Sequence, residues 1–191
     1  MEKKVLLFLT DGFEEAEALV TADLLRRGGV SVVTASITGN KLVTGSHDIT
    51  VTADALFGEA AEGAYDAVII PGGPGTKNYF EHKELLAFIK KSGEDKNKLT
   101  AAICAAPSVL GSLGLLDGKR ATCYPGYEDK LGEALFTGGP AVTDGNIITG
   151  RSAGCVFDFA LEILKYLCGG ETSEKIRAAI VYTPALQSLP A

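Results

Sequence analysis

The 191-residue chain is short of the side chains that many binding and catalytic sites require. It has only 2 histidines, and its 4 cysteines form no C-x-x-C pair, which argues against a zinc site and against a disulfide scaffold. Lys77 follows Thr76 instead of the glycine of a P-loop, and no G-x-G-x-x-G follows the first apolar run. We therefore expect neither a metal nor a nucleotide cofactor.

The chain also lacks clusters of Lys and Arg and long apolar runs. With a formal net charge of -6, it is not expected to use nucleic acid or an anionic membrane as its main partner. The apolar run at residues 5–9 is too short for a signal peptide or a membrane span, and no cleavage motif follows it. Hydrophobic residues at 46% and charged residues at 22% are typical of a globular enzyme. We expect a cytoplasmic protein with reduced thiols, folded as one domain over residues 1–191.

Apolar runs and helical patterns alternate along the chain. The runs expected to be buried strands are Val5–Thr10, Ser31–Ala35, Ala67–Ile70 and Leu99–Ile103, with a weaker one at Arg120–Cys123. The expected helices are Glu14–Arg27, Lys83–Lys91, Pro107–Leu113, Cys155–Cys168 and Ser173–Ala179. The expected antiparallel hairpins pair Leu42–Thr44 with Ile49–Thr52 and Val142–Thr143 with Ile147–Thr149. This order predicts an α/β fold with a mostly parallel sheet that the small hairpins extend or flank.

Cys104 is the strongest candidate for a reactive residue, because it lies between an apolar run and a helix that starts near Pro107. A tight turn from a strand into a helix exposes one side chain at the carboxyl edge of a sheet, where the N–H of the next residue can face it. The helix N-terminus is expected to favour the thiolate. The alternative is that Cys104 is a small buried hydrophobic residue.

Glu17 is the second candidate, because it falls on the apolar face of the first helix, whereas Glu14 and Glu15 point away. A carboxyl group on a buried face is expected to have a raised pKa and to donate or accept a proton, unless it reaches solvent at the helix edge. The segment Pro71-Gly72-Gly73-Pro74-Gly75 should form another wall of the same crevice. Its backbone N–H groups could form an oxyanion hole, and a plain tight turn is the alternative.

The two histidines offer little support for catalysis. Ser46-His47-Asp48 contains the residue types of a catalytic triad, but consecutive side chains on an extended segment point to opposite faces. His82 is expected to be an exposed residue at the start of a helix. If Cys104 is catalytic, Glu17 is therefore the best candidate to carry the proton.

Four motifs, in this order, resemble those of the ThiJ/PfpI superfamily. They are Gly12-Phe13-Glu14-Glu15-Ala16-Glu17, Ile70-Pro71-Gly72-Gly73, Ala101-Ala102-Ile103-Cys104-Ala105-Ala106-Pro107 and Gly150-Arg151-Ser152-Ala153-Gly154. The resemblance runs from about Lys3 to Tyr182 and is greatest to the branch of the parkinsonism-associated protein deglycase and its bacterial relatives.

This resemblance implies a flavodoxin-like three-layer sandwich that forms a homodimer. It further implies that Cys104 is a nucleophilic thiol of low pKa and that Glu17 is a protonated acid hydrogen-bonded to it. The backbone N–H groups of Gly73 and Ala105 would face the thiol. Activities reported for the family include cofactor-free conversion of methylglyoxal to lactate, repair of early glycation adducts, redox sensing and chaperone-like holding.

The chain departs from the family pattern at three positions. Tyr124 stands before Pro125 where the human-type branch has a histidine, and it could orient a substrate through its hydroxyl. Protease-like members have a histidine directly after the nucleophile, where this chain has Ala105, which argues against hydrolysis of amides. His47 replaces an arginine of the dimer contact, so the resemblance implies that this contact is altered.

The sequence therefore predicts a cofactor-free cysteine enzyme of the glyoxalase or deglycase type, acting on reactive oxoaldehydes or glycated amines in oxidative stress. The first alternative is a redox-sensing or chaperone-like protein that uses the same oxidisable cysteine. A cysteine amidase or peptidase is weaker, and a scaffold acting through a dimer surface leaves a buried Glu17 unexplained. Cys123, Cys155 and Cys168 receive no role from the sequence.

Overall fold

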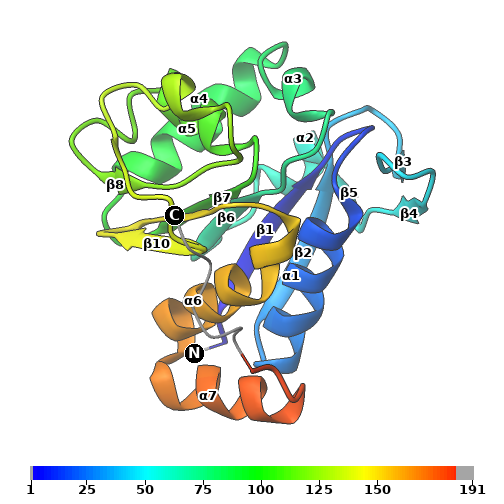
Figure 1. Ribbon diagram of the computed structural model, residues 1–191. Helices are drawn as coiled ribbons and strands as arrows, with labels where there is room; N and C mark the ends of the chain where they lie inside the picture. Colours follow the sequence, from blue (N-terminus) through cyan, green and yellow to red (C-terminus); the bar gives the residue numbers. More distant parts are fainter. Residues whose placement is uncertain (1, 184–191) are drawn as a thin grey trace.

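A seven-stranded sheet forms the centre of the computed structural model, which describes residues 2–183 (Figure 1). Its strands are β1 (Lys4–Leu9), β2 (Ser31–Ser36), β5 (Ala55–Leu56), β6 (Ala67–Ile70), β7 (Leu99–Ile103), β10 (Ala141–Asp144) and β11 (Ile147–Gly150). They lie in the order β10-β11-β7-β6-β1-β2-β5, and every neighbouring pair is parallel except β10 and β11. The central order β2-β1-β6-β7-β11 is that of a flavodoxin-like sheet.

Helices cover both faces of this sheet, as the alternation of strands and helices predicted. One face carries α1 (Glu15–Arg27), α6 (Val156–Cys168) and α7 (Gly170–Ala179), and the other carries α2 (Phe57–Ala60), α3 (Thr76–Tyr79), α4 (Lys83–Glu94) and α5 (Pro107–Ser112). Within β1, Leu7 faces the first core and Leu6 and Phe8 face the second, because successive side chains of a strand point to opposite faces. The three-layer α/β sandwich is therefore confirmed.

Both predicted hairpins are present. β3 (Leu42–Thr44) and β4 (Thr50–Thr52) pair in a separate antiparallel sheet that flanks the main one. β10 and β11 form the second hairpin, and β11 extends the main sheet beside β7. The hairpins thus include one that flanks the sheet and one that extends it.

The weaker strand predicted at Arg120–Cys123 is wrong in extent and in place. Only β8 (Arg120–Ala121) forms, and it pairs with β9 (Leu135–Phe136) outside the main sheet. The strand stops because the N–H of Thr122 donates to the side-chain oxygen of Thr149 instead of a backbone carbonyl. A 3-10 helix, η1 (Glu128–Lys130), lies in the segment between β8 and β9. A second one, η2 (Ala153–Cys155), precedes α6.

Several helix boundaries differ from the predictions. The α4 helix continues to Glu94 instead of ending at Lys91. It includes Gly93, where a Cβ would lie 2.6 Å from a Leu115 methyl carbon. The α7 helix begins at Gly170, before the predicted start at Ser173. The short elements β5, α2 and α3 were not predicted. Within residues 2–183, no helix has the length and apolar character of a membrane span.

The chain leaves β1 toward β2 on one side and later returns to place β6 on the other side of β1. The connections that follow β1 and β6 therefore start side by side, at the carboxyl ends of these strands, and lead away in opposite directions. Open α/β sheets bind their ligands at such a point. This topological switch point positions the candidate site.

Candidate active site

Two glycine-containing loops join at the switch point. The N–H of Glu14, after β1, donates to the carbonyl of Gly72, after β6, over 3.1 Å. In return, the N–H of Gly75 donates to the carbonyl of Gly12 over 2.8 Å. These paired backbone hydrogen bonds fix the start of α1 against the turn that follows β6.

Cys104 directly follows β7 and lies beside these loops. Its backbone is in the left-handed region with a φ of 65°, which is uncommon for a residue other than glycine. Its N–H donates to the carbonyl of Gly150 over 2.9 Å, and its carbonyl accepts from the N–H of Tyr124 over 2.8 Å. The cysteine is half-buried and its backbone is held from two sides.

The glycine turn after β6 is required for the close approach to this cysteine. A Cβ on Gly72 would lie 2.8 Å from the Cβ of Cys104, which no real side chain tolerates. Gly73 has a φ of +94°, and a Cβ there would lie 2.5 Å from the backbone nitrogen of Glu14. The backbone N–H groups of Gly73 and Ala105 both interact with the Cys104 sulfur. The turn therefore does more than reverse the chain, since it brings a donor to the thiol.

Glu17 lies on the buried face of α1, as its helical spacing predicted, with 1% of its surface exposed. Its Oε2 atom accepts a hydrogen bond from the N–H of Gly72 over 2.8 Å. Its carboxyl group interacts with the thiol of Cys104, while Oε1 has no aligned hydrogen-bond partner among residues 2–183. Burial raises the pKa of Glu17 to about 7, against the opposing hydrogen bonds from Cys104 and Gly72.

The thiol of Cys104 does not have the lowered pKa that we expected from the start of α5. Burial raises its pKa to about 12, the neighbouring Glu17 carboxylate adds to this rise, and the N–H groups of Gly73 and Ala105 offset only part of it. Because each group opposes ionisation of the other, the pair loses its first proton near pH 7, from Glu17, while the thiol of Cys104 stays protonated. The proton partner of the sulfur is thus a carboxyl group.

Glu15 is not directed away into solvent, contrary to expectation. Only 6% of its surface is exposed, because the loop between β3 and β4 covers it. Its Oε1 accepts from the N–H of His47 over 2.7 Å, and its Oε2 lies 2.9 Å from His47 Nδ1. Despite the cost of burial, these hydrogen bonds and one from Ser46 hold the pKa of Glu15 at about 2. Conversely, the hydrogen bond to Glu15 raises the pKa of His47.

The segment Ser46-His47-Asp48 is a turn, so the expectation of an extended strand with opposed side chains is wrong. Ser46 Oγ lies 3.0 Å from His47 Nδ1, so the two side chains do meet. Glu15 contacts the same nitrogen, whereas a relay needs the acid and the hydroxyl on opposite ring nitrogens. The arrangement therefore cannot pass a proton through the ring.

The two histidines lie in different surroundings. His82 is exposed and precedes α4, which confirms its predicted place. Glu14, Glu15 and His47 each offer one ligand atom, and these atoms lie within 4.8 Å of one another. Among residues 2–183, these three side chains form the group whose spacing could admit a cation. In the structure their ligand atoms make hydrogen bonds and ion pairs with one another and with the backbone of His47.

Tyr124 reaches the candidate site through its backbone, and its side chain is 47% exposed. Its ring meets that of Tyr127 edge to face, with 6.5 Å between the ring centres. The adjacent Cys123 is fully buried in the core on the α4 and α5 side of the sheet, whereas Cys104 packs against the core on the α1 and α6 side. Cys123 is thus not placed to form a disulfide with Cys104.

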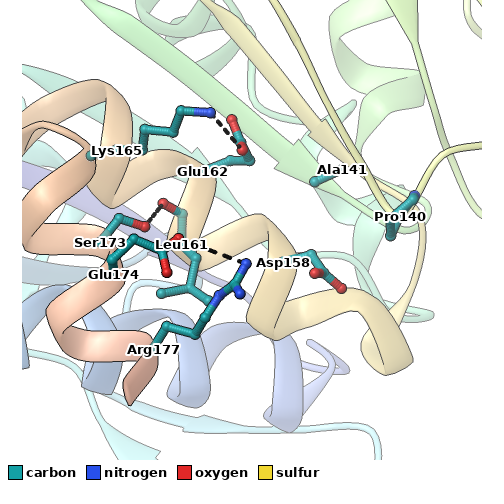
Figure 2. A pocket seen from close by; sticks show the side chains of 10 residues that line it. Pro140, Ala141, Asp158, Leu161, Glu162, Lys165, Ser173, Glu174 and Arg177 are labelled. Atoms are coloured by element: carbon teal, nitrogen blue, oxygen red, sulfur yellow. Dashed lines mark hydrogen bonds and ion pairs between the residues drawn. The ribbon is translucent and has the colours of Figure 1, made fainter. Parts of the chain in front are cut away.

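The cavity in Figure 2 does not include Cys104. It has a volume of about 340 Å³ and lies between β10, α6 and α7. Four of its charged groups are paired, Lys165 with Glu162 at 3.3 Å and Arg177 with Glu174 at 3.7 Å. The fifth, Asp158, accepts a hydrogen bond from the Tyr182 hydroxyl over 2.8 Å. A thiol, a carboxyl group and backbone donors converge instead at Cys104, which is therefore the candidate site.

Two supports of the site, Gly150 and the loop over Glu15, were not predicted from the sequence. Gly150 opens the motif Gly150-Arg151-Ser152-Ala153-Gly154, which was the available signal. A Cβ on Gly150 would lie 2.8 Å from a side-chain carbon of Ile103, so this position admits no larger residue. Nothing local in the sequence links Glu15 to His47.

Comparisons with known proteins support this assignment of the fold. Residues 3–166 match the DJ-1/PfpI family. The chain is 35% identical over 183 residues to protein dj-1beta of Drosophila melanogaster, covering 95% of this chain and 98% of that protein. It is 31% identical over 166 residues to a deglycase of Pyrococcus abyssi, covering 86% of this chain and 99% of that protein.

Solved structures agree over nearly the whole chain. A cysteine-to-alanine mutant of a DJ-1 superfamily protein from Salmonella typhimurium superposes with a TM-score of 0.90 at 38% identity, covering 95% of this chain and 99% of that one. Oxidised DJ-1 of Toxoplasma gondii superposes with a TM-score of 0.90 at 34% identity, with the same coverage of 95% and 99%.

Proposed function

Because this chain belongs to the DJ-1/PfpI family, which has a deglycase among its members, we propose that it is a cofactor-free cysteine enzyme that converts reactive α-oxoaldehydes to 2-hydroxy acids. Methylglyoxal, which would give lactate, is the simplest substrate of this class. The observation that carries the proposal is the contact between the thiol of Cys104 and the buried carboxyl group of Glu17. No cofactor takes part.

The first step is addition of sulfur to the aldehyde carbon. Glu17 has a pKa of about 7 and is therefore suited to accept the thiol proton of Cys104 at neutral pH as the S–C bond forms. The product is a hemithioacetal whose oxygen carries the developing negative charge. The N–H groups of Gly73 and Ala105 already point at the sulfur and are the nearest donors for that oxygen.

The second step moves hydrogen within the bound substrate. Glu17 first gives the thiol proton to the hemithioacetal oxygen and becomes a carboxylate again. It then moves a proton from the former aldehyde carbon to the neighbouring carbonyl oxygen, which gives an enediol. Finally it takes the proton of the hydroxyl on the sulfur-bearing carbon and delivers it to the adjacent carbon. This isomerisation yields a thioester of the 2-hydroxy acid on Cys104 without any external oxidant. Water then cleaves the thioester, releases the 2-hydroxy acid and restores the thiol. In the overall reaction, one oxoaldehyde and one water give one 2-hydroxy acid.

Glycated amines are a second form of the same substrate, with the aldehyde carbon already bonded to nitrogen. We propose that the side chain of Tyr124 orients either form, because its backbone N–H donates a hydrogen bond to the carbonyl of Cys104 and its ring is exposed. A tyrosine hydroxyl can donate to a substrate oxygen, which a phenylalanine at this position could not do. The Tyr124→Phe enzyme should therefore have a raised KM with little change in kcat.

The test is to incubate pure protein with methylglyoxal and to measure lactate from the wild type, Cys104→Ser and Glu17→Gln, with Cys168→Ser as the control. Wild type and control should form lactate, and the two site variants should lose at least about 100-fold in rate. In deuterated water, an enediol step places deuterium on the carbon that bears the hydroxyl. Equal lactate from all four proteins would overturn the proposal.

A redox-sensing or chaperone-like role is the second candidate function. It is favoured by the similarity to oxidised Toxoplasma gondii DJ-1 and by the half-buried position of Cys104 beside an acid. A protonated Glu17 could donate to an oxygen of a sulfinic acid formed on that sulfur. Mass spectrometry after mild peroxide treatment should then find two added oxygens at Cys104, with Cys168 unmodified, and no turnover of oxoaldehydes.

Amide hydrolysis remains the weaker interpretation. A poor amine leaving group needs a proton donor beside the nucleophile, commonly a histidine. No hydrogen bond joins His47 or His82 to Cys104 in the described part of the chain. Turnover of a simple peptide amide is not expected.

A homodimer is also part of the proposal. Large apolar side chains remain exposed on α1 and around the β3–β4 hairpin, namely Leu19, Leu42 and Ile49. The hairpin loop carries His47, whose side chain is 69% exposed and paired with Glu15 of its own chain. We infer that a second copy covers this side of the molecule.

A further inference from the structure

A separate cavity lies at the opposite edge of the sheet from Cys104. It has a volume of about 180 Å³ and is lined by Ala61, Gly63, Tyr65, Val68, Phe88, Lys91, Ser92 and Lys98. Lys98 precedes β7 and Cys104 follows it, so the length of that strand, roughly 16 Å, separates the two places. The cavity therefore takes no part in the chemistry proposed for Cys104, and its ability to bind a ligand does not depend on that chemistry.

The polar groups of this cavity are donors. Lys91 and Lys98 line it, and neither has an ion-pair partner within residues 2–183. Ser92, of which 6% is exposed, accepts a hydrogen bond from the Thr100 hydroxyl over 3.4 Å, and its own proton has no acceptor in the same part of the chain. No Asp or Glu lines the cavity. Two unpaired lysines and a serine hydroxyl with a free proton thus line a space that has no carboxylate in its walls.

The remaining walls are apolar and partly aromatic. Phe88 and Val68 line the space beside the ring of Tyr65. The Tyr65 hydroxyl donates to the carbonyl of Ala60 over 3.0 Å, which fixes the ring. Lys4 adds a further positive charge, with its Nζ atom 5.0 Å from the centre of that ring. The walls suit a flat apolar group and the rim suits a negative charge.

Two features of the surroundings oppose an anion, and both are already neutralised. The last turn of α4 presents carbonyl groups, but Asn146 donates its amide hydrogens to the carbonyls of Gly93 and Asp95. The Asp66 carboxylate pairs with Lys3 over 2.8 Å. The unpaired lysines therefore supply the charge of the lining itself, whereas Glu62, Glu94 and Asp95 follow or precede lining residues without being among them.

From these observations, we propose that this cavity is a binding site for a small aromatic anion, a single ring that carries one carboxylate or phosphate group. A cavity of roughly 150 Å³ holds a benzene ring, so about 180 Å³ admits one ring and places its anionic group between the two lysines. Lys91 and Lys98 would bind the anionic oxygens together with the Ser92 hydroxyl, and Phe88 and Tyr65 would contact the ring.

Titration of the full-length protein with benzoate and with phenyl phosphate, followed by amide NMR, tests this site. Saturable shifts should appear in residues 61–68 and 88–98, with benzyl alcohol, which has no charge, binding at least about tenfold more weakly. The Lys91→Gln/Lys98→Gln double variant should weaken binding at least about tenfold, and Ser92→Ala several-fold. Lys90→Gln/Lys96→Gln removes the same charge from exposed positions outside the lining and should bind like the wild type.

The two probes also separate the sources of the anion, since stronger binding of one identifies a carboxylate or a phosphate ester as the natural group. The absence of saturable shifts with both probes up to about 10 mM would overturn the proposal. So would equal binding by both double variants, or shifts that map to the Cys104 edge. Because the substituted lysines are at the surface, the variants should fold, and their wild-type melting temperatures can verify this.

Discussion

Replacing Glu17 with glutamine should stabilise the protein at alkaline pH while abolishing its proposed activity. The carboxyl group is buried and has a folded-state pKa of about 7, compared with 4.5 for a free side chain. A folded state with the higher pKa binds the proton more tightly than the unfolded state does. Stability is therefore lost as the pH rises from about 4.5 to about 7, and it stays low above that range.

The size of the loss follows from the difference in pKa. Each unit corresponds to about 1.4 kcal/mol, so the folded protein loses about 3 kcal/mol by pH 8 and about 1 kcal/mol at pH 5. Glutamine cannot ionise, but its amide oxygen can still accept from the N–H of Gly72. At pH 8 its melting temperature should exceed that of the wild type by roughly 6–12 °C, given about 2–4 °C per kcal/mol for a domain of this size.

The assay is thermal unfolding of wild type and Glu17→Gln between pH 5 and pH 8.5. Glu84→Gln is the matched control, because it makes the same substitution at an exposed position in the first turn of α4. The control should follow the wild type at every pH, whereas the Glu17→Gln curve should diverge upward as pH rises. A constant offset between Glu17→Gln and wild type, or a less stable variant at pH 8, would refute the reasoning.

Three further predictions rest on the same loops. Gly72→Ala should lower the melting temperature and disturb alkylation of Cys104, because the new Cβ would lie 2.8 Å from the Cys104 Cβ. Gly58→Ala is the control, since its Cβ would have no atom within 4 Å, and it should leave both properties unchanged. His47→Ala should destabilise the protein more at pH 6 than at pH 9. The raised pKa of His47 means that its charged pairing with Glu15 is fully present at low pH and is lost as the imidazolium deprotonates. An equal effect at both pH values in thermal unfolding would contradict this. Light scattering should give the mass of a dimer, and a monomer mass at about 10 µM would contradict the proposed homodimer.

The sequence predicted the parts of the site that repeat at regular spacing or sit at an element boundary. The 100° rotation per residue put Glu17 on the apolar face of α1, and its burial confirms this. Ala67–Ile70 and Leu99–Ile103 were predicted with their observed limits, because each apolar run ends at a clear signal, Pro71 or the turn at Cys104. The roles of these residues in catalysis stay proposals.

The errors arose where distant segments decide the outcome. Glu15 is buried by a loop more than 30 positions further along the chain, which helical periodicity cannot register. The strand expected at Arg120–Cys123 is cut short by the side chain of Thr149. The raised pKa of Cys104 depends on Glu17 and on burial, neither of which is visible beside it in the sequence.

The left-handed backbone of Cys104 lowers the stability of the folded protein at the residue on which the proposed activity depends. A residue with a Cβ at a φ of 65° costs about 1–2 kcal/mol, which glycine would not incur. In most strand and helix positions alanine is more stable than glycine by about 0.5–1 kcal/mol, but here Cys104→Gly should be more stable than Cys104→Ala. The most stable residue for this turn therefore has no side chain, so the thiol that the proposed activity needs is held there at a cost in backbone stability.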